Sequence, residues 1–163
     1  MTGLNLSQVK SLIIVPVLSA FPPRFARPVN LMLGTMLVES SGEFLTQAED
    51  GPARGLFQME IATYADCWSN FLRFPANADV LATVQSTVGS GQFSGSQAMC
   101  GNFYFACAMA RVKYIRVAAA LPDDKDAEAL ANYYKTYYNT AGGAASVAGA
   151  IPLFQTAIDT PLS

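Results

Sequence analysis

The sequence has 163 residues, of which 10 are basic and 12 are acidic, so the net charge is −2, and it contains no histidine. The absence of histidine excludes Ser-His-Asp and Cys-His catalysis and every His-ligated metal site, so acid–base chemistry must depend on carboxylates, Tyr or Lys. Because 52% of the residues are hydrophobic and a chain of this length can bury one large core, we predict a single folded domain over residues 1–163.

The first half of the chain is predicted to contain two apolar helices and a short irregular segment. Ser7 can cap a first helix over residues 7–20, which a Pro-Pro pair ends. A second helix over residues 28–41 carries Leu and Met on nearly every face, and a helix that is apolar all round is a buried helix. Residues 42–60 are rich in Gly, Glu, Asp and Pro, which predicts an irregular segment or a small β-hairpin.

The second half of the chain is predicted to be helical. Asp123 and Asp126 resemble a capping arrangement for an expected helix that ends near residue 139. Pro152 interrupts the last of the expected helices. The expected helices span residues 61–72, 79–88, 100–121, 123–139 and 144–158. No repeat or linker separates them, so the sequence predicts one mainly α domain.

Charge and cysteine content restrict the partners and sites that the chain can have. The acidic balance lacks the basic footprint of a nucleic-acid partner, and the one basic cluster, Arg111, Lys113 and Arg116, is interpreted as a solvent-exposed helix face. The three cysteines have no metal-binding or redox spacing and are predicted to be buried thiols, with one disulfide as an alternative. The longest apolar run is much shorter than the ~20 residues of a membrane-spanning helix, so no integral membrane protein is expected.

Half of the carboxylates lie close together in the chain: Glu39, Glu43, Glu49, Asp50, Glu60 and Asp66. Glu39 differs from the others because it lies at the end of the buried helix, on the same side as Met32 and Met36. Burial raises the pKa of a carboxyl group, and a carboxylic acid that stays neutral near neutral pH can act as a general acid. A purely structural salt bridge from Glu39 to Arg54 is the alternative.

Three short motifs follow one another along the chain. Glu39-Ser40 ends the apolar helix, Gly-Leu-Phe-Gln-Met follows at residues 55–59, and Tyr-Tyr-Asn-Thr-Ala-Gly follows at residues 137–142. In this order they resemble the soluble lytic transglycosylases and the similar goose-type lysozymes. The third motif resembles that family's Ala-Tyr-Asn-Ala-Gly sequence, with one extra residue before the glycine. The resemblance covers about residues 28–145 and implies a lysozyme-like, mainly α domain with an irregular or β-hairpin segment after the catalytic helix.

The resemblance implies cleavage of the β-1,4 bond between N-acetylmuramic acid and N-acetylglucosamine in peptidoglycan, with Glu39 as the catalytic acid. In a lytic transglycosylase the same Glu then acts as a base while the muramyl 6-hydroxyl attacks, which gives a 1,6-anhydro end. In a goose-type muramidase, the alternative, a second carboxylate activates water, and Glu60 is the candidate. Neither reaction needs a metal or an organic cofactor.

Further site residues follow from the resemblance and from side-chain chemistry. Tyr138 is expected to place its phenol near Glu39 or near the substrate acetamido group. The Gln58 amide suits sugar acetamido or hydroxyl groups, and Gly55 allows the backbone to approach the glycan. The other predicted substrate contacts are Ser40, Leu56, Phe57, Met59 and Asn139, of which Ser40 is expected mainly to position the end of the Glu39 helix. Candidate sugar-stacking rings, with core packing as the alternative, are Tyr64, Trp68, Phe93 and Tyr104.

The expected partner is the glycan strand of peptidoglycan, in the bacterial periplasm or cell wall. Some phage particle proteins resemble this family, so we expect delivery by a phage particle, with other virion proteins as partners, or by lysis. Secretion is the alternative, because Lys10 precedes an apolar stretch that ends at Ala20. A different class of function, a non-catalytic wall-binding or virion structural module, also stays open.

Overall fold

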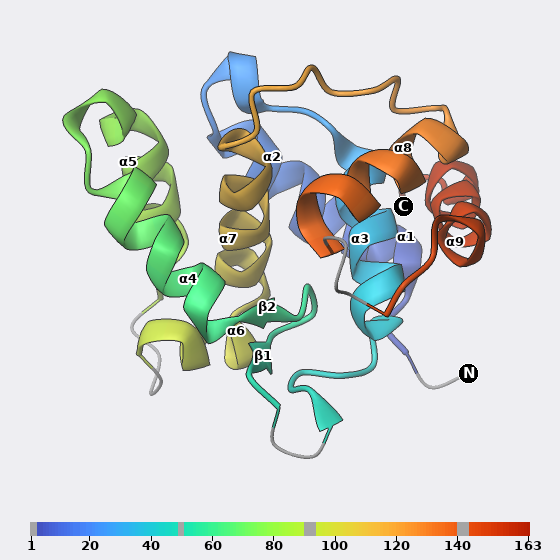
Figure 1. The fold of residues 1–163 in the computed structure, drawn as a ribbon, viewed down its shortest axis with the longest axis horizontal. Coiled ribbons are helices and arrows are strands. Elements are labelled where there is room, and N and C mark those ends of the chain that lie inside the picture. Colours follow the sequence, from blue (N-terminus) through green and yellow to red (C-terminus); the bar gives the residue numbers. More distant parts are fainter. Residues whose placement is uncertain (1–2, 49–50, 90–93, 140–143) are drawn as a thin grey trace.

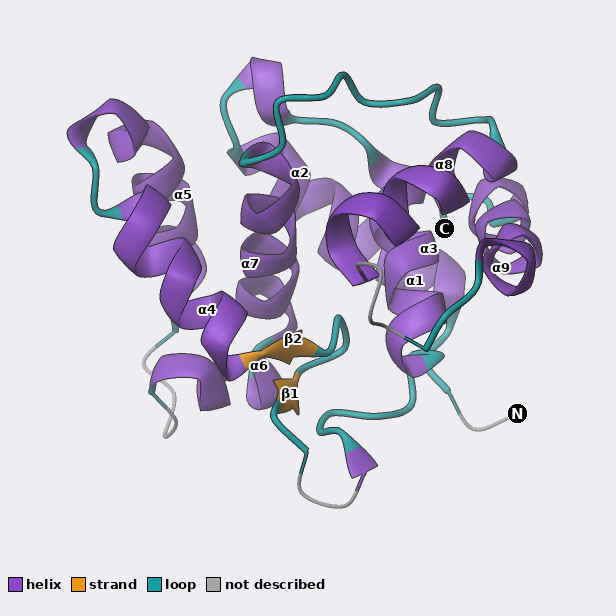
Figure 2. Ribbon diagram, in the orientation of Figure 1, coloured by secondary structure: helices purple, strands orange, loops and turns teal. Residues whose placement is uncertain are grey.

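The protein is mainly helical, as predicted, with a small antiparallel hairpin (Figure 2). The structure is a computed structural model that describes residues 3–48, 51–89, 94–139 and 144–163. In these four ranges, no helix combines the length and hydrophobicity needed to cross a membrane.

The N-terminal helical segment comprises α1 (Leu6–Val9), a π-helical turn (Lys10–Ile14) and α2 (Val15–Ala20). Its cap is Asn5 rather than the predicted Ser7, because the Asn5 side chain accepts a hydrogen bond of 3.1 Å from the backbone amide of Gln8. This contact satisfies one of the free amides in the first helical turn. The segment ends before the Pro-Pro pair, as the sequence predicted.

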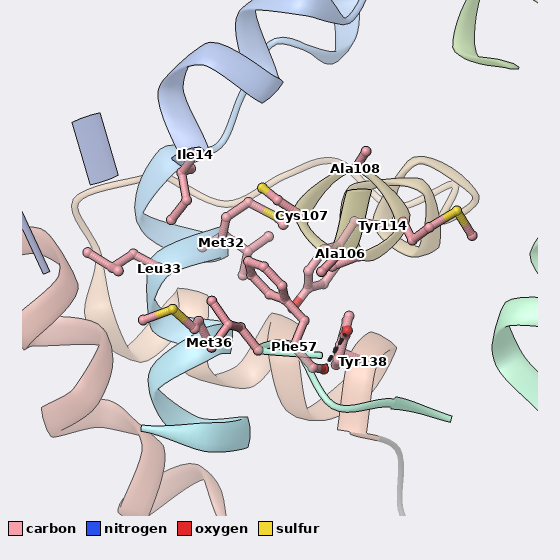
Figure 3. Close-up of a cluster of buried hydrophobic side chains, with 14 of the residues drawn as sticks. Ile14, Met32, Leu33, Met36, Phe57, Ala106, Cys107, Ala108, Tyr114 and Tyr138 are labelled. Carbon is pink, nitrogen blue, oxygen red and sulfur yellow. Dashed lines mark hydrogen bonds between the residues drawn. The ribbon is translucent and has the colours of Figure 1, made fainter. Parts of the chain in front are cut away.

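The helix α3 (Val29–Ser40) is the buried helix that the sequence predicted. The side chains of Met32, Leu33 and Met36 lie fully inside the core (Figure 3), as does that of Leu31. Gly34 allows the close approach of α9 (Val147–Asp159), because a Cβ atom at Gly34 would lie 2.1 Å from Cδ1 of Phe154. Packing on all sides therefore fixes the position of α3.

Both ends of α3 are defined by specific contacts. At the start, the Asp124 carboxylate accepts hydrogen bonds from the backbone amides of Asn30 and Leu31, at 3.0 and 3.2 Å. A carboxylate there satisfies free amides and interacts favourably with the helix dipole. At the other end, Ser41 has a left-handed backbone with φ of 54°, which ends the helix at Ser40, one residue after Glu39.

The segment after α3 contains the hairpin of β1 (Ala53–Arg54) and β2 (Met59–Glu60), so the prediction for residues 42–60 is confirmed. The turn between the strands begins at Gly55, whose φ is +74°. A Cβ atom at this position would lie 2.7 Å from the carbonyl oxygen of Met99. Only glycine meets both conditions without strain.

The next four helices confirm two predictions and correct a third. The chain forms α4 (Ile61–Cys67) with a π-helical turn to Leu72, α5 (Ala78–Thr87), α6 (Ala98–Gly101) and α7 (Phe103–Ile115). A single helix over residues 100–121 was wrong, because Asn102 leaves the helical conformation and its side chain caps α7 through the amide of Phe105 at 2.9 Å. The helix also ends at Ile115, six residues before the predicted end.

The C-terminal helices are α8 (Ala127–Tyr134), which continues into a π-helical turn (Lys135–Asn139), and α9. Asp126 alone caps α8, by accepting a hydrogen bond from the amide of Ala129 at 3.0 Å. Helix α9 continues through Pro152 without a break, so the predicted interruption at this residue is wrong. Figure 1 shows α4 and α5 on one side of α7, and α3, α8 and α9 on the other.

Two predictions about cationic and thiol side chains are corrected. The basic cluster does not form a solvent-exposed face, because Arg111 is buried and Lys113 and Arg116 are partly buried. Cys67 and Cys107 are buried as expected, and Cys100 is partly exposed. All three cysteines are free, so the disulfide alternative is wrong.

Candidate active site

Glu39 lies in the last turn of α3 with its side chain partly buried. Tyr134, the last residue of α8, donates its hydroxyl to Glu39 Oε1 at 2.6 Å. The side chain of Asn139, in the π-helical turn after α8, also favours the ionised form of the carboxyl group. One later segment of the chain therefore brings two side chains to Glu39.

The pKa of Glu39 is raised above its ordinary value, and burial is the largest cause. The hydrogen bond from Tyr134, the positive charge of Lys113 and the side chain of Asn139 act in the opposite direction, because each favours the ionised form. The negative charge of Glu60 adds to the effect of burial. The net raised pKa makes Glu39 a better proton donor near neutral pH than an exposed glutamate.

A polar pocket of about 130 Å³ lies beside Glu39. It brings together five residues that the sequence predicted for the site, namely Glu39, Gln58, Glu60, Tyr138 and Asn139. Thr63 and Lys113 complete its lining. The pocket therefore contains both candidate carboxylates, one at the end of α3 and one in β2.

The structural alternative for Glu39 is wrong, because Arg54 does not pair with it. The Arg54 Nη1 atom instead donates to the carbonyl oxygens of Gly51 and Ala53. Apart from Glu60, the described acidic residues of the sequence cluster do not line the pocket. Asp66 pairs with Arg116, Glu43 is exposed, and Glu49 and Asp50 lie outside the described residues.

Tyr138 does not place its phenol against Glu39. Its hydroxyl donates to the carbonyl oxygen of Phe57 at 2.8 Å, inside the core (Figure 3). The phenol that reaches Glu39 belongs to Tyr134, whose ring lies stacked beside that of Tyr138 with 6.1 Å between centroids. Tyr138 still contributes to the wall of the pocket. The run of tyrosines in the sequence indicates that this part of the chain belongs to the site. The run does not show which hydroxyl, that of Tyr134 or that of Tyr138, contacts Glu39.

Most residues of the second motif (residues 55–59) pack in the core and do not line the pocket. The side chains of Leu56, Phe57 and Met59 are buried in the core, and Gly55 packs against α6. None of these four residues lines the pocket beside Glu39. Gln58 is the exception, and its Nε2 atom donates to the carbonyl oxygen of Gly55 at 2.9 Å.

Ser40 positions the end of α3, and its side chain is not accessible to substrate. It is buried, and its Oγ atom donates to the carbonyl oxygen of Leu56 at 2.6 Å. The same Oγ atom accepts a hydrogen bond from the amide of Gly42 at 3.2 Å. These contacts agree with the expected positioning role, and burial of the side chain argues against direct contact with substrate.

Lys113 is the charged pocket residue that the sequence analysis missed. Its Nζ atom donates to the carbonyl oxygen of Tyr138 at 2.6 Å and lies 4.0 Å from the centre of the Tyr138 ring. Burial lowers the pKa of Lys113, and the neighbouring charge of Glu39 counteracts this shift. The apolar residues on either side of it in the sequence, Val112 and Tyr114, are the signal that this lysine belongs to a buried helix.

Of the candidate sugar-stacking rings, Tyr64, Trp68 and Tyr104 do not line the pocket. Tyr64 packs edge-on against Trp68 and Phe105, with centroid distances of 6.1 and 6.3 Å. The alternative prediction, that the rings pack in the core, is therefore correct for Tyr64 and Trp68. Tyr104 is exposed and donates its hydroxyl to the carbonyl oxygen of Leu12 at 2.7 Å. Phe93 lies outside the described residues.

The three motifs meet at the pocket. The hydrogen bond from Ser40 to Leu56 joins the first motif to the second, and that from Tyr138 to Phe57 joins the third to the second. The last three residues of the third motif lie outside the described residues. In the described part of the chain, no three His, Cys, Asp or Glu side chains are grouped as a metal site would need. No protein-family model, curated protein sequence or solved structure matches this chain.

Proposed function

We propose that this protein cleaves the β-1,4 bond between N-acetylmuramic acid and N-acetylglucosamine in peptidoglycan by a lytic transglycosylase mechanism. The observation that carries the proposal is the setting of Glu39, a partly buried carboxyl group with a raised pKa that Tyr134 holds beside a polar pocket. A lysozyme-like fold is part of the same proposal. It is supported by the order of a buried helix that ends at Glu39, a β-hairpin and later helices that return to the carboxyl group.

The first step uses Glu39 as a general acid. Cleavage of a glycosidic bond develops positive charge at the anomeric carbon and negative charge on the leaving oxygen. The neutral Glu39 carboxyl group donates its proton to that oxygen, which releases the N-acetylglucosamine end with a free hydroxyl group. The carboxylate that remains is stabilised by the hydrogen bond from Tyr134, by the side chain of Asn139 and by the charge of Lys113.

The second step uses the same carboxylate as a base. It accepts the proton of the muramyl 6-hydroxyl while the oxygen of that hydroxyl bonds to the anomeric carbon. The product is a 1,6-anhydro end, and Glu39 is again neutral, so no proton is gained or lost overall. One carboxyl group is sufficient, and the amides of Gln58 and Asn139 are the candidates for contacts with sugar hydroxyl and acetamido groups.

Hydrolysis of the same bond is the second candidate, and it is favoured by the position of Glu60. This residue shares the pocket with Glu39, so it can serve as the base that activates water in an inverting muramidase. The two reactions leave different products. Hydrolysis adds one water molecule, whereas the transglycosylase leaves an anhydro end that is lighter by that water.

The decisive experiment is the release of soluble muropeptides from purified sacculi in water labelled with heavy oxygen. Wild-type protein is expected to release unlabelled anhydro ends, and Glu39→Gln is expected to release none. Glu128→Gln is the matched control, because it makes the same chemical change at an exposed residue at the start of α8. Full release by Glu39→Gln would refute the assignment of Glu39.

The same measurement separates the remaining possibilities. Heavy oxygen in the products, lost in Glu60→Gln, would assign the muramidase reaction instead. Binding to sacculi without any soluble product would assign a wall-binding or virion structural module. We propose that the protein acts in the bacterial periplasm or cell wall after delivery by a phage particle or by lysis. Local delivery agrees with the negative net charge, since no long-range attraction to an anionic wall is then needed.

A further inference from the structure

Lys113 is the cation among the described residues that line the pocket beside Glu39. It lies in α7, and its side chain is partly buried. Its Nζ atom donates to the carbonyl oxygen of Tyr138 at 2.6 Å and lies 4.0 Å from the centre of the Tyr138 ring. Because Tyr138 also lines the pocket, these two contacts hold the charged end of Lys113 at the pocket wall.

The ammonium group of Lys113 keeps a donor that these contacts do not use. A lysine ammonium has three N–H donors and no acceptor. The carbonyl oxygen and the ring face of Tyr138 occupy at most two of them. Within the described part of the chain, no carboxylate lies within ion-pair distance of Lys113. At least one charged N–H is therefore left for an acceptor on a ligand, and such hydrogen bonds are stronger than those between neutral groups.

The charges around the pocket indicate which kind of acceptor suits Lys113. Burial lowers the pKa of Lys113, whereas the negative charges of Glu39 and Glu60 raise it, so both carboxylates favour the ammonium form. An anionic group of a ligand would meet these carboxylates as well as the ammonium group, and like charges at short distance repel. A neutral carbonyl oxygen accepts from the cation without this repulsion. An ammonium group of a ligand at the same place would be repelled by Lys113.

The glycan of the proposed substrate carries such a carbonyl oxygen in the acetamido group of each sugar. A cavity of about 150 Å³ binds benzene, so a pocket of about 130 Å³ holds an acetamido group but not a whole sugar. Sugar hydroxyl groups donate and accept, so the carboxylates and the amides of Gln58 and Asn139 can bind them. The acetamido carbonyl oxygen only accepts, which matches a group that only donates.

We propose that Lys113 is a specificity-determining residue, whose Nζ atom donates to the acetamido carbonyl oxygen of a sugar bound at the pocket. The protein therefore selects N-acetylated glycan over glycan that has lost its acetyl groups. The inference rests on the proposed function for the identity of the ligand, a β-1,4-linked glycan. It adds a recognition step to that function, because neither proton transfer by Glu39 requires a contact with the acetamido group.

Isothermal titration of the full chain with three β-1,4-linked tetrasaccharides tests the proposal. Glu39→Gln is the starting protein, because this substitution prevents cleavage during the titration. The ligands are the tetramers of N-acetylglucosamine, glucosamine and glucose, which carry an acetamido, an ammonium and a hydroxyl group at the same position. The titrations are made at about pH 6, where the amines are protonated. The N-acetylated tetramer is expected to bind at least about tenfold more tightly than either of the others.

Adding Lys113→Met removes the ammonium group and keeps an unbranched side chain. The preference for the N-acetylated over the glucosamine tetramer is expected to fall by about tenfold or more, because one ligand loses a donor and the other loses a repulsive neighbour. Lys113→Gln keeps a neutral donor for the Tyr138 carbonyl oxygen, is expected to lower the same preference, and decides if Lys113→Met does not fold. Lys125→Met is the matched control, because it changes an exposed lysine outside the pocket lining, and it is expected to leave the preference unchanged.

Several outcomes overturn the inference. Absence of binding of the N-acetylated tetramer at millimolar concentration would do so, and so would equal affinity for the N-acetylated and glucose tetramers. An equal loss of affinity for all three ligands in the Lys113 variants would show that Lys113 only supports Tyr138. Product release from sacculi judges the proposed function separately. If wild-type protein releases products and the Lys113 variants keep the ligand preference, only this inference fails. If no product is released and the preference depends on Lys113, only the proposed cleavage fails.

Discussion

Removal of the Tyr134 hydroxyl tests how the carboxyl group of Glu39 is controlled. The hydrogen bond from this hydroxyl to Oε1 is 2.6 Å long and partly buried. A hydrogen bond to a charged group contributes about 1.5–3 kcal/mol, and it favours the ionised carboxylate over the neutral acid. In Tyr134→Phe the ion loses this stabilisation, so the pKa of Glu39 is expected to rise further above its ordinary value.

Two measurements follow this change. In the proposed reaction, loss of the Glu39 proton produces the basic limb of the pH profile of kcat/KM, and in Tyr134→Phe this limb is expected to move to higher pH. Carbon-13 NMR titration of labelled Glu side chains, assigned with Glu39→Gln, reports the same shift without relying on activity.

Tyr138→Phe is the matched control for this experiment. It removes a hydroxyl four residues later, but that hydroxyl bonds to the Phe57 carbonyl oxygen and not to Glu39. The variant is expected to be destabilised by about 1–3 kcal/mol, because a buried carbonyl loses its donor, while the titration of Glu39 changes little. An unchanged or lowered pKa in Tyr134→Phe, or an equal shift in both variants, would refute the role assigned to Tyr134.

Three further predictions concern stability, each measured by urea unfolding. Because the native pKa of Glu39 is raised, the wild-type protein loses stability as the pH rises through that pKa, so Glu39→Gln is expected to gain more stability near pH 7 than near pH 4. Gly34→Ala is expected to cost about 1–3 kcal/mol or more, because the new Cβ atom would overlap the ring of Phe154. Asn102→Ala removes the cap of α7 at Phe105 and is expected to cost about 1 kcal/mol.

The position of Glu39 was predictable because two local signals agree. A helix without a polar face must be buried, and a carboxylate at the end of such a helix must be at least partly desolvated. The structure confirms the buried helix, and burial raises the pKa of Glu39. The hairpin after α3 was predictable in the same way, from turn residues that do not fit a helix.

The partner of Glu39 was not predictable, because it depends on how a later helix is oriented. Tyr134 and Tyr138 are four residues apart and lie on the same face of an ordinary α-helix. Between them the chain enters a π-helical turn (Lys135–Asn139), in which hydrogen bonds join residues five apart and the faces of the helix shift. Which hydroxyl then reaches Glu39 is decided by packing against α3 and the hairpin.

The buried cations were misread for a related reason. A helical segment with Arg111, Lys113 and Arg116 has the charge pattern of a solvent-exposed face, and the pattern carries no information about carbonyl oxygens elsewhere in the chain. The structure supplies those acceptors from Phe25 for Arg111 and from Tyr138 for Lys113. Long cationic side chains reach such distant acceptors while their methylene groups pack in the core.

The surroundings of Glu39 suit a carboxyl group that must be an acid in one step and a base in the next. A pocket that only desolvated it would hold the proton too tightly to release it, and one that only offered donors and positive charge would keep it ionised. Burial and Glu60 favour the neutral form here, whereas Tyr134, Lys113 and Asn139 favour the ion. Since both forms are supported by groups already in place, little reorganisation is needed when the proton moves. This balance explains how one carboxyl group, in a chain without histidine, can perform both proton transfers of the proposed reaction.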